Sequence, residues 1–479
     1  MREAAAVENV RPVSMHWTLE EIATATGGVV LGGTPELAAT SVSTDSRHVT
    51  PGDVFFALRG PNHDGHDFVT AASGLGAVAA VVDHRLDDLP AAQVCVTDTT
   101  KALGDLAQWT RSREQTRIVA VTGSNGKTTT KEMIAAICAA AEFPAPRWRV
   151  LKSEGNENNH IGLPRTLLRL QGDEAVVVLE MGMNHPGEIA WLTEIARPDY
   201  ALITNIGSAH LEGFGGSMAG VAAAKAELFA GLGPDAVMVV NLDDEWVRRV
   251  AARFSTRKVT FGAQGEVRAD AIVDLGFDGL AFDLELAGET ARVRLRMVGH
   301  HNVYNALAAA AVAHAMGLSR DVIACGLERT VLTPMRMQIA RLVNGVTVIN
   351  DTYNANPSSA EAALVALRRF SGRPLVVLGE MRELGDEARR AHRFIGERAA
   401  ALGVHELVLL GTHAEAAASG ARAGGLAADA IHVCRSHAEA AEAVVARWQP
   451  GDVVLVKGSR SMRMEEVVRL LERAGGGAS

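Results

Sequence analysis

The sequence predicts an α/β protein of three domains, and three observations lead to that prediction. The chain has 479 residues, which at roughly 150 residues per domain corresponds to about three separate cores. Short apolar runs alternate with helix-like segments along most of the chain, a pattern typical of parallel sheets covered by helices. A glycine-rich stretch also joins one apolar run to a helix start, as in nucleotide-binding sheets. We expect domains at residues 1–98, 99–333 and 334–479.

The first domain is predicted to be a small α/β unit. Strand-like runs occur at VFFAL (54–58), AVAAVVD (77–83) and QVCVTD (93–98), and Gly and Pro residues separate them. This part of the sequence contains no phosphate loop.

The central domain is predicted to contain a mostly parallel sheet. Its apolar runs are IVAVTG, AVVVLEMG (175–182), ALITNIG (201–207) and AVMVVN (236–241). Residues 269–298 break this alternation and are expected to form a β-meander, followed by an alanine-rich helix over 303–316.

The third domain repeats the alternation of apolar runs and helical segments. Its runs are VTVIND, PLVVLG, ELVLLG, AIHVC and DVVLVKG. We expect a Rossmann-like, doubly wound sheet, although the G-x-G-x-x-G fingerprint of dinucleotide binding is missing from the sequence.

Composition excludes several classes of function. The net charge is -9 and no block of Lys and Arg occurs, so we expect no nucleic-acid partner. The four cysteines are scattered, which favours small core residues in a reducing cytoplasm over a metal site or a disulfide framework. We expect no export signal and no membrane insertion, since no apolar run approaches ~18 residues.

The stretch TGSNGKTTT (122–130) has the composition of a phosphate-binding loop. Backbone N–H groups of Gly123, Ser124, Asn125, Gly126, Lys127, Thr128 and Thr129, together with the positive end of the following helix, would hold phosphates. Lys127 would reach the β and γ phosphates, and the hydroxyl of Thr128 would bind Mg²⁺. The loop is shorter than the usual G-x-x-x-x-G-K-[ST], because Val121 stands where the first glycine is expected.

Three further residues lie near the ends of the central strands, where open α/β sheets bind ligands. Glu180 ends AVVVLE, His210 follows ALITNIG, and Lys225 belongs to the helical segment GVAAAKAELF. Each also has an ordinary interpretation: a solvated strand end, a hydrogen-bonded surface histidine and an exposed helical lysine.

Polar residues also gather near the start of the last central helix and the start of the third domain. Asn302 and Asn305 share a helix face and could bind a purine edge, or they could cap and flank the helix. Arg336 could clamp a γ phosphate and Asp351 could bind ribose hydroxyls, with Tyr353 beside them; the turn that follows would also suit an ordinary loop.

Several motifs together resemble those of the Mur ligases of peptidoglycan synthesis. They are TGSNGKTTT, EMGMNHPGEIAW, NIGSAHLEGFG, AAAKAELF, GHHNVYNALAA and DTYNANPSSAEAAL, in this order. Within the family, GNENNHIGLPRTLLRL, the NANP turn and LGEMRELG are similar to the branch that adds D-alanyl-D-alanine. One departure is Met335, which stands where a glycine often precedes the family's arginine.

The resemblance implies an ATP-dependent, ADP-forming ligase that joins D-alanyl-D-alanine to UDP-N-acetylmuramoyl tripeptide through an acyl phosphate. Its catalytic residues would be Lys127, His210, Lys225 and Arg336, which the family uses mainly for positioning and charge neutralisation. It also implies two Mg²⁺ ions held by Thr128, Glu180, His210 and Lys225, with Lys225 carbamylated, since a carbamate is an anionic ligand and an ammonium is not.

The resemblance also implies where the two substrates bind. Ser46 and Arg47, in STDSRHVTPGDVFFALRG, would contact the uridine diphosphate, and Asn158 and Asn159 would contact the muramoyl peptide. The candidates for the dipeptide carboxylate are Asn354, Asn356, Lys457, Ser459 and Arg460, although a KGS-R turn could also cap the following helix. We expect a cytoplasmic monomer.

Two other functions remain open on the sequence. A folylpolyglutamate-type ligase would share the short phosphate loop and the amide chemistry, but it would lack the nucleotide domain with TDSR and DGHDF. A nucleotide-binding switch or scaffold would not need Glu180, His210 and Lys225 together.

Overall fold

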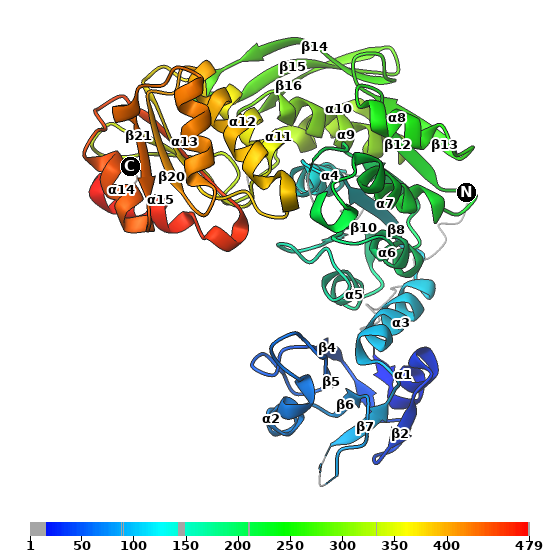
Figure 1. Ribbon diagram of the computed structural model, residues 1–479. Coiled ribbons are helices and arrows are strands. Elements are labelled where there is room, and N and C mark those ends of the chain that lie inside the picture. The colour runs from blue at the N-terminus through cyan, green and yellow to red at the C-terminus, as the bar shows by residue number, and fades with distance from the viewer. Residues whose placement is uncertain are drawn as a thin grey trace.

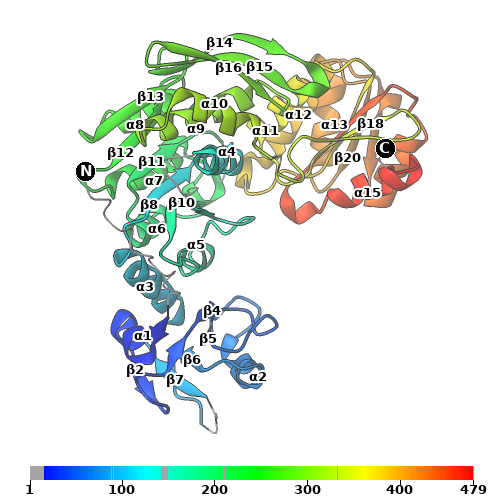
Figure 2. The ribbon, with the colours of Figure 1, turned by 180° about the vertical axis from the view of Figure 1, so that it is seen from behind.

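The computed structural model describes residues 16–87, 89, 91–141, 149–208, 211–331 and 333–477. Figures 1 and 2 show three α/β units along the chain: a blue N-terminal unit, a cyan-to-green central unit and a yellow-to-red C-terminal unit. The N-terminal unit is connected to one end of the central unit through α3 (Thr99–Ser112), whereas the C-terminal unit lies against the side of the central unit. The predicted three-domain α/β class is confirmed.

The N-terminal unit is built on a sheet of five strands in the order β2-β7-β6-β5-β4. Helix α1 begins with a capping box, in which Thr18 accepts a hydrogen bond from the Glu21 N–H and the Glu21 side chain accepts one from the Thr18 N–H. The elements are β1 (Trp17–Thr18), α1 (Leu19–Thr26), β2 (Val29–Leu31), β3 (Ala38–Ala39), β4 (Ser41–Ser43), β5 (Asp53–Phe56), η1 (Gly65–Phe68), α2 (Val69–Gly74), β6 (Ala79–Val82), β7 (Ala92–Cys95) and α3 (Thr99–Ser112).

Helix α3 connects the first unit to the second and packs against both. It begins at an Asp98 cap, packs on α1 on one side and on α5 and α6 on the other. Its Leu103 and Leu106 belong to one apolar core that continues from Phe56 in the first sheet to Ile118 in the central sheet. The predicted boundary at 98/99 therefore falls at the start of a helix that the two units share.

The central unit has a sheet of nine strands in the order β16-β15-β14-β13-β12-β11-β8-β10-β9. The expected meander is confirmed, but it is not a separate layer: β14 pairs with the parallel strand β13, and β15 and β16 extend the same sheet in antiparallel fashion. The strands are β8 (Arg117–Thr122), β9 (Arg149–Lys152), β10 (Glu174–Glu180), β11 (Tyr200–Ile203), β12 (Val237–Asn241), β13 (Arg257–Phe261), β14 (Val267–Asp274), β15 (Leu280–Leu286) and β16 (Glu289–Leu295).

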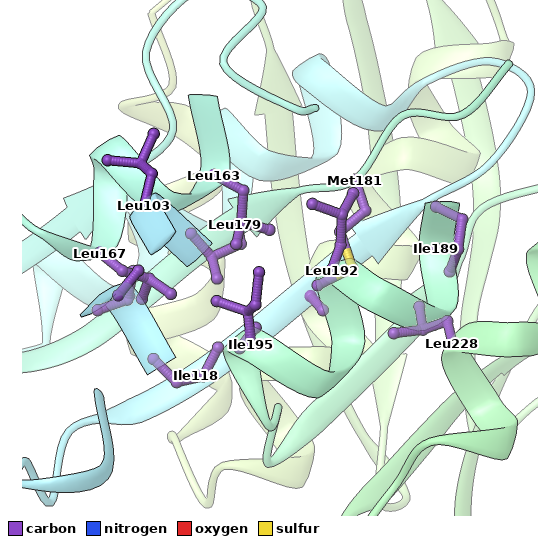
Figure 3. Close-up of a cluster of buried hydrophobic side chains, with 14 of the residues drawn as sticks. Leu103, Ile118, Leu163, Leu167, Leu179, Met181, Ile189, Leu192, Ile195 and Leu228 are labelled. Carbon is purple, nitrogen blue, oxygen red and sulfur yellow. The ribbon is translucent and has the colours of Figure 1, made fainter. Parts of the chain in front are cut away.

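Helices cover both faces of the central parallel part of this sheet, which explains why strands such as β8, β11 and β12 are mostly apolar on both faces. Successive residues of β8 point to opposite faces: Ile118 and Ala120 pack in one core, Val119 and Val121 in the other. Figure 3 shows the first core, where Ile118 and Leu179 meet the side chains of α5 and α6. The helices are α4 (Lys127–Ala140), α5 (Gly162–Leu167), α6 (Glu188–Ala196), η2 (Leu211–Phe214), α7 (Met218–Ala230), α8 (Glu245–Ala251), η3 (Gly276–Asp278), α9 (His301–Ala315) and α10 (Arg320–Glu328).

The C-terminal unit has a sheet of six strands in the order β17-β18-β22-β19-β20-β21, in which only the edge strand β17 is antiparallel. This is the predicted doubly wound arrangement. Its elements are β17 (Gln338–Arg341), β18 (Thr347–Asp351), α11 (Pro357–Leu367), β19 (Pro374–Leu378), η4 (Gly385–Glu387), α12 (Ala388–Ala401), β20 (Glu406–Leu410), α13 (Ala414–Ala423), η5 (Ala428–Ala430), β21 (Ile431–Cys434), α14 (His437–Val445), β22 (Val453–Lys457), η6 (Arg460–Met462) and α15 (Glu465–Ala474).

The structure also bears on two expectations from composition. Cys138 is buried, and Cys95, Cys325 and Cys434 are partly buried, with all four thiols free. Among the residues that the structure describes, no helix is both long and apolar enough to cross a membrane.

Candidate active site

A cavity of about 1020 Å³ lies between the central and C-terminal units. Its walls come from the phosphate loop, from the ends of β10 and β11, from the start of α9, and from the loops that follow β18 and β22. These strand ends are the carboxyl ends, where open α/β sheets bind ligands. A volume of this size accommodates a nucleotide together with part of a second substrate.

The phosphate loop (123–129) connects β8 to α4, and two glycines give it its shape. Gly126 takes φ +82°, a left-handed value, and its missing side chain leaves room for the amide of Asn305. The loop is held from β11: Asn205 accepts from the Asn125 N–H through its side-chain oxygen, at 2.9 Å, and Thr204 donates to the Asn125 carbonyl, at 2.6 Å. The end of β11 thus holds the loop backbone at Asn125.

Lys127 begins α4, and its ammonium donates back to the Gly123 carbonyl at 2.8 Å, across the phosphate loop. Although part of Lys127 is accessible from the cavity, burial lowers its pKa, and the negative charge of Glu180 acts in the opposite direction. The ammonium therefore lies at the phosphate loop, in the wall of the cavity.

Thr128 and Glu180, both predicted to bind the metal, contact each other. The Thr128 hydroxyl donates to Glu180 Oε2 at 2.8 Å, and the second oxygen of Glu180 accepts from Asn158 Nδ2 at 2.9 Å. Glu180 is only 3% exposed, so a solvated strand end is not the right description. A buried carboxylate beside a hydroxyl supplies the hard oxygen ligands that Mg²⁺ prefers, so the residues present fit that ion.

Sequence reasoning missed two residues that lie next to Glu180, one of which, Ser153, contacts it directly. The Ser153 hydroxyl accepts from the Glu180 N–H at 3.1 Å, and the buried ammonium of Lys131 donates to the Ser153 carbonyl. Lys131 lies one helical turn after Lys127 on α4. This i, i+4 spacing is the signal that could have identified Lys131 as part of the site.

Arg336 comes from the segment that enters the C-terminal unit, yet it reaches the phosphate loop. Its Nη2 donates to the Thr128 hydroxyl at 2.8 Å, and its guanidinium lies 4.1 Å above the ring centre of Tyr353. Among the described residues, its buried Nε has no hydrogen-bond partner. A buried N–H of a cation that lacks a partner fits an anionic ligand in the cavity.

The residue before Arg336 explains a departure from the family pattern. Met335 takes φ +61°, and its carbonyl accepts from the Tyr353 N–H at 3.1 Å. Glycine adopts this left-handed conformation most easily, which is consistent with the glycine that the resemblance leads one to expect here. The chain here retains the conformation with a methionine.

Lys225 is 1% exposed on α7 and is not among the described residues that line the cavity. Burial, and secondly the charge of Lys127, place its pKa well below the ordinary lysine value. The ordinary interpretation as an exposed helical lysine is therefore wrong. His210, the fourth predicted metal ligand, lies outside the described residues.

Asn302 and Asn305 line the cavity beside the phosphate loop, both 6% exposed. Asn302 Nδ2 donates to the Val298 carbonyl at 2.8 Å, and Asn305 Nδ2 donates to Asn302 Oδ1 at 2.9 Å. Neither residue caps α9, which begins after His300. The Val298 carbonyl orients the amide of Asn302, which in turn orients the amide of Asn305.

Asp351 and Lys457, predicted to contact different ligands, pair with each other. Lys457 Nζ lies 2.6 Å from Asp351 Oδ2 and also donates to the Asn354 carbonyl at 2.9 Å. They end the neighbouring strands β18 and β22. The pair places one anion and one cation in the wall of the cavity.

The other dipeptide candidates differ in position. Asn354, Asn356 and Arg460 line the cavity, whereas Ser459 is buried beneath it and binds the Ala355 carbonyl and the Arg382 N–H. The turn does place Ser459 at the start of η6, but its side chain does not cap that helix.

The two candidates for the nucleotide part of the substrate lie elsewhere. Ser46 and Arg47 follow β4 in the N-terminal unit, and the described residues that line the cavity all come from position 124 onward. Arg47 is exposed and donates two hydrogen bonds to Asp45, at 2.9 and 2.7 Å. Asn158 and Asn159, the candidates for the peptide part, do line the cavity.

Three family models match the chain. The model described as "Mur ligase family, catalytic domain" matches residues 39–110, "Mur ligase middle domain" matches 121–313, and "Mur ligase, glutamate ligase domain" matches 335–460. Together they cover all three units.

Curated relatives match over almost the whole chain. The UDP-N-acetylmuramoyl-tripeptide--D-alanyl-D-alanine ligase of Escherichia coli K12 is 38% identical over 464 residues, which is 96% of this chain and 99% of that relative. The protein of the same name from Bacillus subtilis is 35% identical, covering 89% and 92%.

Solved structures agree with these relatives. A MurF crystal structure from Acinetobacter baumannii has a TM-score of 0.87 at 34% identity, over 97% of this chain and 100% of that one. MurF of Thermotoga maritima, solved in complex with ADP, has a TM-score of 0.80 at 29% identity, over 91% and 97%. A folylpolyglutamate synthase of Mycobacterium tuberculosis has a TM-score of 0.61 at 19% identity, over 79% and 95%, a likeness of fold alone.

Proposed function

Because the chain belongs to the Mur ligase family, we propose that it joins D-alanyl-D-alanine to UDP-N-acetylmuramoyl tripeptide at the expense of ATP, forming the pentapeptide precursor of peptidoglycan. Relatives with that name match from one end of the chain to the other, at up to 38% identity. The observation that carries the proposal is the meeting of Lys127, Arg336, Thr128 and Glu180 in one cavity. This set of charges suits the activation of a carboxylate by a nucleotide triphosphate.

The reaction would proceed in two steps, formation of an acyl phosphate and attack on it by an amine. A carboxylate oxygen of the tripeptide attacks the γ phosphorus, the bond from that phosphorus to the bridging oxygen of ADP breaks, and an acyl phosphate forms. The amine of the dipeptide then attacks the acyl carbon; an amide bond forms, and inorganic phosphate and the amine proton leave.

The chain's own residues must bring two anions together, a carboxylate and a triphosphate. Arg336 donates to the Thr128 hydroxyl from the C-terminal unit, and Lys127 donates to the Gly123 carbonyl across the phosphate loop, so their positive charges would flank the transferring phosphoryl group. Hydrogen bonds to a charged group contribute about 1.5–3 kcal/mol each. The cavity walls keep the reacting groups in place and reduce the entropy lost in the bimolecular encounter.

We also propose that the protein binds two Mg²⁺ ions, with Thr128, Glu180, His210 and Lys225 as their ligands. Bound there, the ions would offset the negative charge of the phosphates and the carboxylate. Lys225 fits a carbamylated ligand: its amine is buried, and burial lowers its pKa well below the ordinary lysine value, which favours the neutral amine. A neutral amine adds to CO₂ with loss of a proton, which would give a buried anion in place of the amine.

Nucleotide recognition is assigned to side chains around the phosphate loop. Asn302 and Asn305 would bind the purine edge, and Asp351 would bind the ribose hydroxyls with Tyr353 alongside. Asp351 already accepts from Lys457 and from the Met337 N–H, at 2.6 and 3.2 Å. These bonds fix its carboxylate before the nucleotide arrives.

The tripeptide substrate would extend from the first unit to the cavity. We assign the uridine diphosphate to residues 1–98, with Ser46 and Arg47 as contacts, and the muramoyl peptide to Asn158 and Asn159. The dipeptide would enter beside Asn354, Asn356, Lys457, Ser459 and Arg460 in residues 334–479, with residues 99–333 binding ATP. Exposure of Arg47 leaves its guanidinium accessible to a diphosphate. The protein would work as a cytoplasmic monomer.

An ADP-release assay with the purified chain, Mg-ATP and the tripeptide precursor tests the function. D-alanyl-D-alanine is compared with D-glutamate, L-lysine and diaminopimelate as acceptors, and the tripeptide is supplied with either lysine or diaminopimelate at its third position. We expect ADP release that requires both the tripeptide and D-alanyl-D-alanine. Release with a free amino acid only would contradict the proposal, as would release with folate and L-glutamate.

A further inference from the structure

A closed ring of three hydrogen bonds joins the phosphate loop to the C-terminal unit. Asn125 Nδ2 donates to the Ser358 hydroxyl at 2.8 Å, the Ser358 hydroxyl donates to Asn356 Oδ1 at 2.9 Å, and Asn356 Nδ2 donates to Asn125 Oδ1 at 2.8 Å. Each side chain gives one hydrogen bond and receives one within the ring. All three residues line the cavity.

The chemistry of the ring depends on these residue types. An amide offers a donor and an acceptor on one rigid group, and a hydroxyl can donate and accept at the same atom. Alanine at Asn125 or at Ser358 would remove two of the three bonds. Threonine at 358 would keep the hydroxyl and so could keep the ring.

The two sides of the ring are fixed independently. Asn205 and Thr204 hold the backbone of Asn125. Asn356 caps α11, where its Oδ1 also accepts from the Ser359 N–H at 2.9 Å. The ring therefore joins two preformed surfaces that lie 231 or more residues apart in the chain.

The ring lies close to the contact that matters for the reaction. Arg336 crosses from the C-terminal unit to Thr128, three residues after Asn125 in the phosphate loop. Ser358 remains exposed on the cavity wall, so water can replace its partners when the units separate. Bonds that water can replace make a reversible connection of modest strength.

We propose that Asn125, Ser358 and Asn356 form a latch that closes the C-terminal unit onto the phosphate loop and keeps Arg336 within reach of the ATP phosphates. They are positioning residues for the ligase reaction, and the inference rests on the proposed function for its kinetic part. Asn356 would then act through the phosphate loop rather than by binding the dipeptide carboxylate.

The test compares Ser358→Ala, Asn125→Ala and the double variant with a matched control, Ser359→Ala. Ser359 belongs to the same helix start and bonds to the Asn356 backbone, at 3.0 and 3.1 Å, as part of the helix cap. The first measurement is the radius of gyration by small-angle scattering with Mg and a non-hydrolysable ATP analogue. We expect the wild type and Ser359→Ala to become compact, and Ser358→Ala and Asn125→Ala to remain more extended.

The second measurement is steady-state kinetics of product formation. Ser358→Ala and Asn125→Ala should each lower kcat/KM for ATP about three- to tenfold, a range set by the small net effect of neutral hydrogen bonds. The double variant should be no worse than either single variant, because either change opens the same ring. Ser358→Thr should restore most of the activity.

Two results would overturn the latch: equal effects of Ser358→Ala and Ser359→Ala, or losses that add in the double variant. The scattering result does not depend on which acceptor is used. If the wild type failed to ligate D-alanyl-D-alanine, the proposed function would be wrong, and the compaction of the variants would still decide whether the latch exists.

Discussion

Replacement of Gly126 by Ala perturbs the phosphate loop at the point where it meets Asn305. Gly126 has φ +82°, and a Cβ there would lie 2.2 Å from Asn305 Oδ1. A side chain in the left-handed region costs about 1 kcal/mol or more. Moving Asn305 would also disturb its hydrogen bonds to Asn302, at 2.9 Å, and to Thr130, at 3.4 Å, at about 0.5–1.5 kcal/mol each.

The sum is about 2–4 kcal/mol, and we expect it to appear in nucleotide binding. The loop borders the cavity and can relax when no ligand is bound, so binding must restore the strained conformation. At 1.4 kcal/mol per tenfold change, the Kd for an ATP analogue should rise roughly 30- to 1000-fold, measured by titration calorimetry. Gly425→Ala is the control, since Gly425 has φ +94° but open space around it. A Gly126→Ala Kd within threefold of the wild type would refute the reasoning.

Three further changes probe other parts of the structure. Lys225→Ala should abolish ADP release that depends on both substrates, with partial recovery in a small carboxylic acid such as acetate; unchanged release would rule out Lys225 as a ligand. Arg336→Lys should lower kcat about 10- to 100-fold, because a lysine cannot both donate to Thr128 and stack on a ring; a loss below threefold would contradict that role. Burial lowers the pKa of His392, so as the pH falls below about 6.5 the unfolded chain takes up this proton before the folded chain does, and the free energy of unfolding decreases; melting curves from pH 5 to 7.5 should show that the stability advantage over His392→Gln shrinks below pH 6.5, and a constant difference would argue against it.

The sequence was sufficient for the parts of the site that depend on local pattern. The phosphate loop follows from glycines and a lysine between a strand and a helix, and Glu180 follows from its place at the end of an apolar strand. The double burial of the central sheet was also visible, since β8 is apolar on both faces. These features need only a few neighbouring residues.

Contacts between distant segments could not be derived in this way. Asp351 and Lys457 are 106 residues apart. The sequence predicted that Asp351 binds the ribose and that Lys457 binds the dipeptide carboxylate, and it gave no sign that the two side chains pair. The Ser358 hydroxyl gave no signal at all, because a serine after Asn-Pro is ordinary helix-start chemistry. The joining of the meander to the parallel sheet likewise depends on a single pairing, Phe261 with Val267.

Transfer of oxygen-18 from substrate to phosphate tests the central claim most directly. The terminal carboxylate of the tripeptide is labelled, and the reaction with ATP and D-alanyl-D-alanine is analysed by mass spectrometry. If an acyl phosphate forms, the inorganic phosphate carries one labelled oxygen and the pentapeptide product has lost one. Unlabelled phosphate formed together with the peptide product would contradict the account.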